Sequence, residues 1–421
     1  MLRSYLTLAW KILLRRKFFT FISLFGISFT LMVLLVIVAF FDHLSGPQVP
    51  EKQLDRMLFV SLLKQRIAGG NGWNNSPFSA HFIDEYVRTL PTPQAVALTS
   101  MTENATAFTP TQRLTLDLRY TDGVFWQMLD FDFLAGRAFT PAEVKQATPL
   151  AVLNESTART YFGTATGVVG REIEINLRHF RVVGVVKDVP GVRLYSYSDV
   201  WVPYTLAPNG FADRRLSGNF LAILLARRVA DVPAMQAEFQ QMMPRIIIPD
   251  PKQIDHLYAY ADPLLGTITR QLLGFSSGDQ TTASDQLGTF YLLCTVLGLL
   301  FMLLPTLNLV NLNVTRILER SSEIGVRKAF GASGATLVGQ FLVENLVLSL
   351  LGGVLGLGLA AGALALLNDS HIIAYSHFGL NWRVFGWGLV LAVAFGLLSG
   401  VYPAWKMSKM NPVDALRGSG K

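Results

Sequence analysis

The run FFTFISLFGISFTLMVLLVIVAFF, residues 18–41, decides the fold class of this chain because it holds 24 residues without a charge. A helix needs about 20 apolar residues to cross the hydrocarbon core of a bilayer. Three more uncharged runs of sufficient length follow, at 286–315, 345–368 and 384–405. We therefore predict a membrane protein with four transmembrane α-helices.

The composition and the leader agree with a membrane anchor. Hydrophobic residues make up 51% of the 421 residues and charged residues 15%, whereas a soluble domain carries roughly 25% charged residues. The first run is too long for a signal peptide, and VAFFDHLSG after it offers no cleavage site. The leader at 1–17 has the pattern of an amphipathic helix in the membrane interface, and a simple extension of the first span is an equal alternative.

The net charge of +7 is concentrated beside the apolar runs. Residues 42–285 contain 22 Lys and Arg against 24 Asp and Glu, while the rest of the chain contains 14 against 5. This distribution follows the positive-inside rule, so we predict cytoplasmic termini and an extracytoplasmic domain at 42–285. It also removes the basis for predicting a nucleic-acid partner.

The 42–285 region alternates patterns typical of strands and helices, which predicts a large α+β domain and favours two subdomains. We expect AGGNGWNNSP (68–77) to be a loop. STARTYFG (156–163) predicts a helix that ends at Gly163, and DVPAMQAEFQQMMPRI (231–246) one opened by Asp231, with Pro233 in its first turn. Predicted strands are LTLDLRY (114–120), REIEINL (171–177), HFRVVGVVKDV (179–189) and NFLAILLARR (219–228), with a hairpin between the second and third.

The usual signatures of an enzyme are missing from the sequence. There is no G-x-x-x-x-G-K-[ST] run for a nucleotide, no H-E-x-x-H motif for a metal and no nucleophile elbow. The only cysteine is Cys294, in the second apolar run, which excludes an intrachain disulfide. We predict no catalytic residue, no metal site and no cofactor on this chain.

The apolar runs contain a few polar and helix-breaking residues. Glu344 is a candidate functional carboxylate because charges inside a membrane are costly. The alternative, which we favour, is that it bonds to polar groups of a neighbouring helix, for which Asn308, Asn311 and Asn313 are candidates. Pro305 predicts a kink in the second span. Small-residue pairs that let helices approach closely are Gly352 with Gly356 and Gly396 with Gly400, within one chain or between chains.

A charged stretch at 316–334 separates the second and third apolar runs. As a helix it would pair Arg316 with Glu319, Arg320 with Glu323, and Glu323 with Arg327. Gly331 would then end the helix before the third span. Such a rigid helix can pass force from a cytoplasmic partner into the membrane, and a basic loop that only sets orientation is the alternative.

The segment ILERSSEIGVRKAFGASGATLVGQFLVENLVLSLLGGVLG (317–356) resembles the hallmark of the MacB/FtsX-like permeases of type VII ABC transporters. YPAWKMSKMNPVDALR (402–417) resembles the tail of that family, with Ser408 where alanine is usual. Residues 149–190 are similar to the MacB-type periplasmic core. The hallmark is matched by Glu319, Arg320, Glu323, Ile324, Gly325, Arg327, Lys328, Gly331, Ala332, Gln340, Phe341 and Glu344.

The resemblance implies a permease that dimerises with a second copy or a paralogue and binds ABC ATPase subunits at its cytoplasmic face. ATP and Mg²⁺ would bind on the ATPase, and 316–334 would be the coupling helix that passes its closure to the outer domain. MacB-type efflux proteins carry a nucleotide-binding domain before their first span. This chain begins with the leader at 1–17, so we expect a separate ATPase. The expected location is the bacterial inner membrane.

Three functions fit the resemblance. The first is an exporter subunit that acts with a periplasmic adaptor or substrate protein. The second is a permease that extracts lipoproteins from the outer leaflet, among membrane lipids. The third is a regulator like FtsX, which passes force to a periplasmic partner and moves no cargo, although 42–285 is longer than the outer domain of such regulators.

The sequence thus predicts nine segments in order along the chain. They are a leader (1–17), a first span (18–41), an outer domain (42–285), a second span (286–315), a coupling helix (316–334), a third span (335–368), a short outer loop (369–383), a fourth span (384–405) and a cytoplasmic tail (406–421).

Overall fold

The computed structural model divides the chain into two compact units. The helical unit comprises residues 1–42, 291–372 and 378–421, and the globular unit comprises His43–Phe290 together with Ile373–His377. The structure describes the chain except for residues 1–6, 8–9, 12, 16, 71, 209–213, 274–282, 320–325, 327–329, 331–332, 371, 377, 380–381 and 409–421.

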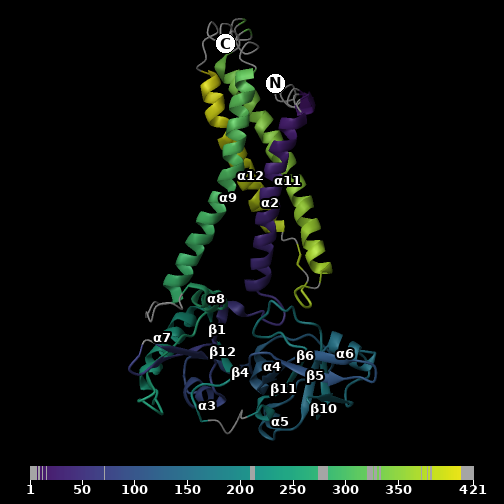
Figure 1. The fold of residues 1–421 in the computed structure, drawn as a ribbon, viewed down its shortest axis with the longest axis vertical. Helices are drawn as coiled ribbons and strands as arrows, with labels where there is room; N and C mark the ends of the chain where they lie inside the picture. The colour runs from purple at the N-terminus through teal and green to yellow at the C-terminus, as the bar shows by residue number, and fades with distance from the viewer. Residues whose placement is uncertain are drawn as a thin grey trace. The chain divides into compact units, whose positions relative to one another are not determined.

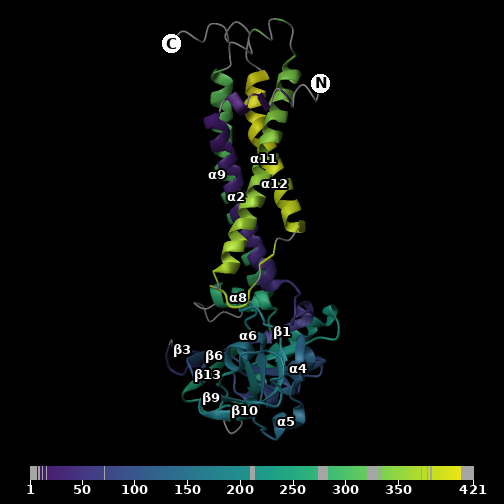
Figure 2. The ribbon, with the colours of Figure 1, turned by 90° about the vertical axis from the view of Figure 1, so that its right-hand side faces the viewer.

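Long apolar helices dominate the helical unit. They are α2 (Lys17–Ser45), α9 (Ala283–Glu319), α11 (Gly334–Asp369) and α12 (Trp382–Ser408), and Figures 1 and 2 show α2, α11 and α12 alongside one another. By length and apolar composition, Lys17–Ser45, Val338–Asp369 and Trp382–Val401 could each cross a membrane. The described apolar stretch of α9 is the shorter Leu287–Leu303, so the second span, at 286–315, stays a prediction.

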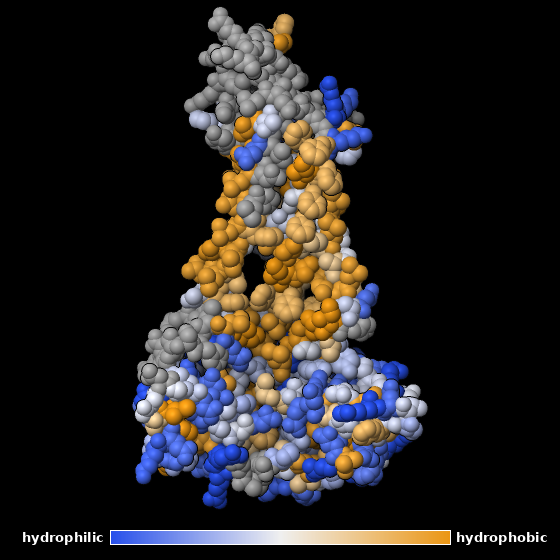
Figure 3. All heavy atoms as spheres, viewed as in Figure 1, coloured by the Kyte–Doolittle hydropathy of each residue, from blue (hydrophilic) through white to orange (hydrophobic). Residues whose placement is uncertain are grey.

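The surface of these helices is itself apolar, as Figure 3 shows. Phe18, Phe21 and Phe25 of α2 are more than half exposed, and so are Leu292 and Leu297 of α9. In water such a surface would cost free energy in proportion to its area, whereas lipid removes that cost. The exposed side chains therefore support a membrane environment for this unit.

The globular unit contains a ten-stranded mixed sheet and a three-stranded sheet, both within the described residues. The large sheet has the order β1-β12-β4-β6-β11-β8-β10-β7, with β5 beside β6 and β9 beside β10, and the small sheet has the order β13-β2-β3. The strands are β1 (Met57–Val60), β2 (Leu63–Ile67), β3 (Trp73–Ser76), β4 (Ala95–Ser100), β5 (Glu103–Phe108), β6 (Arg113–Thr121), β7 (Phe133–Gly136), β8 (Leu150–Asn154), β9 (Glu172–Ile175), β10 (Arg178–Val186), β11 (Val200–Pro203), β12 (Phe220–Leu225) and β13 (Ile254–Ala259).

Short helices surround the sheets and complete the α+β fold that the sequence predicts. The α-helices are α3 (Ala80–Phe82), α4 (Gly123–Met128), α5 (Pro141–Lys145), α6 (Glu155–Phe162), α7 (Val232–Met242) and α8 (Leu264–Leu273). Single turns of other helix types are η1 (Leu54–Arg56), η2 (Ile83–Val87), η3 (Tyr204–Leu206), η4 (Val229–Asp231) and η5 (Met243–Arg245).

Several local predictions are confirmed, each for a clear chemical reason. The predicted helix over 156–163 is α6, which begins where the Asn154 side chain accepts from the Thr157 N–H and ends at Gly163, whose φ of 78° suits glycine. The predicted hairpin joins β9 and β10 through Asn176 and Leu177, both with positive φ. All residues of β12 are buried, as its continuous apolar run predicts.

One local prediction is wrong. Residues 73–76 form β3 rather than a loop, because β3 pairs with β2 and the Lys64 Nζ lies 4.4 Å from the centre of the Trp73 ring. The α7 helix has Asp231 at its N-cap position and Pro233 in its first turn, as predicted, but the Asp231 side chain makes no capping hydrogen bond. The Asp231 carboxylate accepts hydrogen bonds from Arg228 instead.

Candidate functional site

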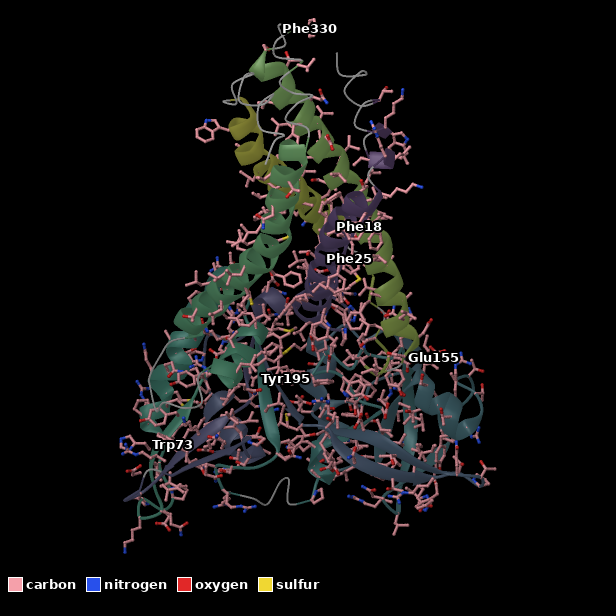
Figure 4. All side chains as sticks on the ribbon, turned by 45° about the horizontal axis from the view of Figure 1, so that its top comes forward. Phe18, Phe25, Trp73, Glu155, Tyr195 and Phe330 are labelled. Atoms are coloured by element: carbon pink, nitrogen blue, oxygen red, sulfur yellow. The ribbon has the colours of Figure 1, made fainter. Side chains whose placement is uncertain are left out.

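The predicted coupling helix lies almost entirely outside the described residues. Glu319 ends α9, and the structure gives its backbone alone. Within the stretch, the Phe330 N–H donates to the Val326 carbonyl over 3.1 Å, and the Phe330 side chain is 89% exposed (Figure 4). The stretch thus presents an exposed apolar side chain at Phe330. Outside the described residues lie Arg320, Glu323, Ile324, Gly325, Arg327, Lys328 and Gly331.

The polar residues of the spans meet between α9 and α11. The Asn313 side-chain amide donates to Asn345 Oδ1 over 3.1 Å, and Asn345 in turn donates to the Phe341 carbonyl. Glu344 is the neighbour of Asn345 in α11 and is 3% exposed. Asn311 is exposed, and for Pro305 and Asn308 the structure gives the backbone within α9. The cluster can hold two helices together, which is a structural role.

The glycine pairs lie where helices of this chain approach one another. A Cβ atom at Gly356 would lie 2.9 Å from the Ser28 carbonyl of α2, and one at Gly352 would lie 2.7 Å from Ile27. A Cβ atom at Gly396 of α12 would overlap Ser349 of α11, and one at Gly400 would crowd Asn345. Any side chain at these positions would push the helices apart.

The globular unit contains a polar site that the sequence did not reveal. It is the segment 190–199, sequence PGVRLYSYSD, which connects β10 to β11 and which we call the junction segment. Its turns are held by hydrogen bonds from the Arg193 N–H to the Pro190 carbonyl and from the Tyr197 N–H to the Arg193 carbonyl. These turns direct Arg193, Tyr195 and Asp199 toward different partners.

Arg193 binds the residues that follow α2 in the chain. Its side chain is completely buried, and Nη1 lies 3.1 Å from Glu51 Oε2. Nη2 donates to the Gly46 carbonyl over 2.7 Å, while the Ser196 hydroxyl donates to the second oxygen of Glu51. A buried ion pair of this kind fixes geometry, because removing either partner leaves an uncompensated charge.

Tyr195 contacts α8, the last described helix before α9. Its ring stacks on Phe59 with 4.5 Å between ring centroids, and its hydroxyl forms hydrogen bonds with the hydroxyl groups of Ser61 and Thr267. Figure 4 labels Tyr195. Burial raises the pKa of the Tyr195 hydroxyl, so the side chain remains neutral at physiological pH.

Asp199 binds the segment between α11 and α12. The Tyr375 hydroxyl donates to Asp199 Oδ1 over 2.9 Å, and the Gly191 N–H donates to the Ala374 carbonyl over 2.7 Å. Tyr375 has a φ of 53°, an uncommon conformation for a residue with a side chain. The Ile373–His377 segment therefore belongs to the globular unit by contact, although the chain connects it at both ends to the helical unit.

The large sheet fixes the position from which Asp199 accepts the hydrogen bond of Tyr375. β11 runs parallel to β6, so Asp199 lies beside Asp117, whose N–H donates to Asp199 Oδ2 over 2.9 Å. The Asn154 side chain donates to the other oxygen. Burial raises the pKa of Asp199, and the hydrogen bonds from Asp117 and Tyr375 oppose that rise.

Arg119 of β6 supports the junction segment from inside the domain. It is 1% exposed, and it donates to the carbonyls of Leu194 and Tyr197 over 2.8 Å each and to the Ser100 carbonyl over 2.5 Å. Burial lowers the pKa of the Arg119 guanidinium to about 10, which still leaves it charged at neutral pH. Backbone carbonyls thus replace the water that this cation loses.

The junction segment therefore contacts three parts of the globular unit: the residues that follow α2, the helix α8, and the segment between α11 and α12. The sequence did not reveal it because Glu51, the partner of Arg193, and Tyr375, the partner of Asp199, lie 142 and 176 residues away in the chain. An Arg and an Asp between two buried strands are the one local signal. Across the described parts of both units, no group of three or more His, Cys, Asp and Glu side chains is arranged to hold a metal ion.

Comparisons with known proteins identify the family. Residues 20–242 match the MacB-like periplasmic core domain, and residues 295–412 match the FtsX-like permease C-terminal domain. The first match alone spans more than half of the chain.

MacB and YknZ proteins occur both among the curated relatives and among the similar solved structures. The macrolide export ATP-binding/permease protein MacB of Burkholderia lata is 27% identical over 97% of this chain and 56% of its own length. The uncharacterized ABC transporter permease YknZ of Bacillus subtilis is 26% identical over 67% of this chain and 65% of its own. This chain thus spans less than two thirds of either relative. A crystal structure of the periplasmic region of MacB from Actinobacillus actinomycetemcomitans covers 53% of this chain and 94% of its own, with a TM-score of 0.36 and 14% identity.

The two domain matches occur in the order in which the globular unit and the last helices follow one another in the sequence. The two domain matches and the apolar helices together show that this chain belongs to the MacB/FtsX-like family of ABC transporter permeases.

Proposed function

We propose that this chain is a permease subunit that couples ATP hydrolysis on a separate ATPase subunit to movement of its globular unit. The globular unit would lie outside the cytoplasm, because the Lys and Arg excess lies at the other ends of the helices. The function would be the export or extraction of a substrate, with ATP and Mg²⁺ bound by the ATPase. The assembly would contain two permease chains.

The junction segment is the observation that carries this proposal. Helices that move must pull on the domain through the residues that follow α2, precede α9 and separate α11 from α12. The residues that follow α2 and those between α11 and α12 are held by buried charged groups at Arg193 and Asp199, whose hydrogen bonds are stronger than those between neutral groups. The helix α8, which precedes α9, is held by the neutral side chain of Tyr195. A rigid attachment passes displacement on, whereas a loose loop would absorb it.

The spans themselves offer little to a polar cargo. Their described buried polar contacts are made within one helix, as Thr306 donates to the Met302 carbonyl, or between helices, as Asn313 joins Asn345. Movement of a domain outside the membrane is therefore favoured over passage of a polar substrate through the helices.

The test is purification of the tagged full chain from its native membrane, followed by reconstitution in nanodiscs. An ABC ATPase should co-purify, and ATP hydrolysis should require it. Spin labels at Leu177 and Trp387, both well exposed, report the movement after Cys294 is replaced by serine. ATP should change the distance between the labels in the complex and leave it unchanged in the chain alone. ATP hydrolysis by the purified chain alone, or failure of any ATPase to co-purify, would contradict the proposal.

A further inference from the structure

An open groove lies between α7 and β13 in the globular unit. The residues that line it are not part of the junction segment. The groove has a volume of about 720 Å³. One wall is formed by Pro233, Gln236, Ala237 and Gln240, which share a face of α7 because of their spacing. The other wall is the length of β13 from Asp255 onward. Apolar side chains of the segment after α7, Met243 and Ile246 among them, complete the lining.

β13 is an edge strand, and the side that β2 leaves uncovered faces α7, whose Gln236 and Gln240 side chains donate to the carbonyls of Ala261 and Ala259. Among the described strands it pairs with β2 alone. The Gln240 side chain donates to the Ala259 carbonyl over 3.0 Å, so that carbonyl points toward α7 and away from β2. Backbone groups of successive residues in a strand point to alternate sides. The N–H and carbonyl of Leu257 therefore also point into the groove.

The charges along this wall are already compensated. Arg66 donates to both oxygens of Asp255 over 2.7 and 2.8 Å, and Arg270 donates to Asp262 over 2.6 Å. The hydrogen bond from Arg66 lowers the pKa of Asp255 to about 2, so this pair stays ionised. A ligand with a net charge gains no counter-ion here, whereas the main chain of a peptide is neutral and supplies both a donor and an acceptor.

We propose that this groove binds an extended, uncharged segment of a partner protein, which adds as a fourth strand beside β13. The main chain of that segment would pair with the N–H and carbonyl of Leu257, and its alternate side chains would enter the apolar part of the groove. An acyl chain could fill the volume but would leave the Leu257 groups without partners. The proposal is independent of ATP coupling, since it requires only the folded globular unit.

The experiment selects phage-displayed peptides of about nine residues, the length of a long strand, on the full chain in nanodiscs, with empty nanodiscs subtracted. The key variant is Leu257→Pro, which removes an N–H that faces the groove and leaves the ladder to β2 in place. The matched control is Leu257→Val, which keeps the N–H. Unfolding temperatures are compared first, so that a misfolded variant is recognised.

Selected peptides should bind the wild type and Leu257→Val alike and bind Leu257→Pro about tenfold more weakly or worse. In an added strand, only every second peptide N–H faces β13. Methylation of the nitrogens that face β13 should therefore weaken binding by a similar factor, and methylation of the other nitrogens should not. This arm uses the unmodified protein and stands even where Leu257→Pro does not fold. Absence of any enriched peptide, or enriched peptides that tolerate methylation at both sets of positions, would overturn the proposal. If lipid copurifies with the chain and none of the peptides displaces it, the groove is a lipid site, and this result would also overturn the proposal.

Discussion

The helical unit and the globular unit differ in the polar contacts that the structure describes, although the helical unit also buries the carboxyl group of Glu344. Between α9 and α11 the described contact is a neutral pair of amides, Asn313 and Asn345, and glycines bring α2, α11 and α12 together. The junction segment instead buries an ion pair and an aspartate that accepts three hydrogen bonds. Each solution suits its solvent. In lipid the hydrophobic effect does not drive helices together, so close backbone contact holds them. A domain in water can instead bury paired charged groups, whose positions the surrounding core fixes.

The contrast assigns different tasks to the two regions. Glycine contacts let helices slide or tilt without breaking a specific bond. Buried charge pairs do not tolerate partial separation, because the exposed partner would regain water and the buried one would not. We therefore expect substitutions in the junction segment to loosen the attachment and substitutions of the glycines to change the packing of the helices.

Arg193→Ala is expected to have the largest effect on stability. It leaves Glu51 buried without its cation, at a cost of about 3–5 kcal/mol. The measurement is thermal unfolding of the nanodisc-embedded chain, followed by tryptophan fluorescence. The neutral double variant Arg193→Met with Glu51→Gln is the control and should recover much of the loss. An unfolding temperature for Arg193→Ala within 1 °C of the wild type would refute the role given to this pair.

Gly356→Ala tests the helical side of the comparison. The new methyl group would lie 2.9 Å from the Ser28 carbonyl, and such overpacking costs about 1–3 kcal/mol. Gly358→Ala is a matched control in the same helix, because a Cβ atom there has no neighbour within 4 Å. The control should be neutral or slightly stabilising. Equal unfolding temperatures for the two variants would show that α2 and α11 do not pack as described.

Asp122 is a buried carboxylate of the globular unit outside the junction segment. It caps α4 by accepting from the Phe125 N–H over 2.8 Å and forms an ion pair with Arg88. The pH dependence of stability tests how burial acts on such a group. Burial raises the pKa of this carboxyl from 3.8 to about 6, so the folded chain binds a proton more readily than the unfolded chain does. Stability from this group therefore increases as pH falls from about 6 to about 4, by on the order of 2 kcal/mol. Asp122→Asn should remove that increase. The readout is the difference in unfolding temperature between the two chains across this pH range, and a constant difference would contradict the assignment.

Tyr375→Phe is expected to have the smallest effect on overall stability. It deletes the hydroxyl that donates to Asp199 and keeps the ring, at a cost of about 1 kcal/mol for a partly exposed contact. The loss should be local, so hydrogen exchange should accelerate at Ala374, Tyr375 and Ser376 and remain unchanged in β11. Unchanged exchange in this segment would mean that the hydroxyl does not hold it.

Much of the fold could be predicted from local patterns. A few neighbouring residues are enough to predict three elements: α2 from its apolar run, α6 from its capping residues, and β12 from its continuous apolar sequence. β3 was missed because its glycine- and asparagine-rich surroundings resemble a loop, and pairing with β2 decides the outcome. The candidate site was harder. Arg193 and Asp199 look unremarkable in the sequence, since their partners Glu51 and Tyr375 come from distant segments that the fold alone brings together.

The most direct test of the central claim is a disulfide that replaces the natural attachment. In a Cys294→Ser background, Gly191→Cys and Ala374→Cys would place their Cβ atoms about 3.5 Å apart, within the range of a disulfide. Tyr375→Ala is added to release the segment, and the distance change on ATP binding is measured in the nanodisc complex between labels attached without cysteine chemistry, so that the two introduced cysteines stay free to form the disulfide. The account predicts that the reduced protein loses most of the ATP-dependent distance change, that oxidation restores it, and that a reductant removes it again. A full distance change in the reduced protein, or no recovery on oxidation, would contradict the claim that the junction segment transmits movement.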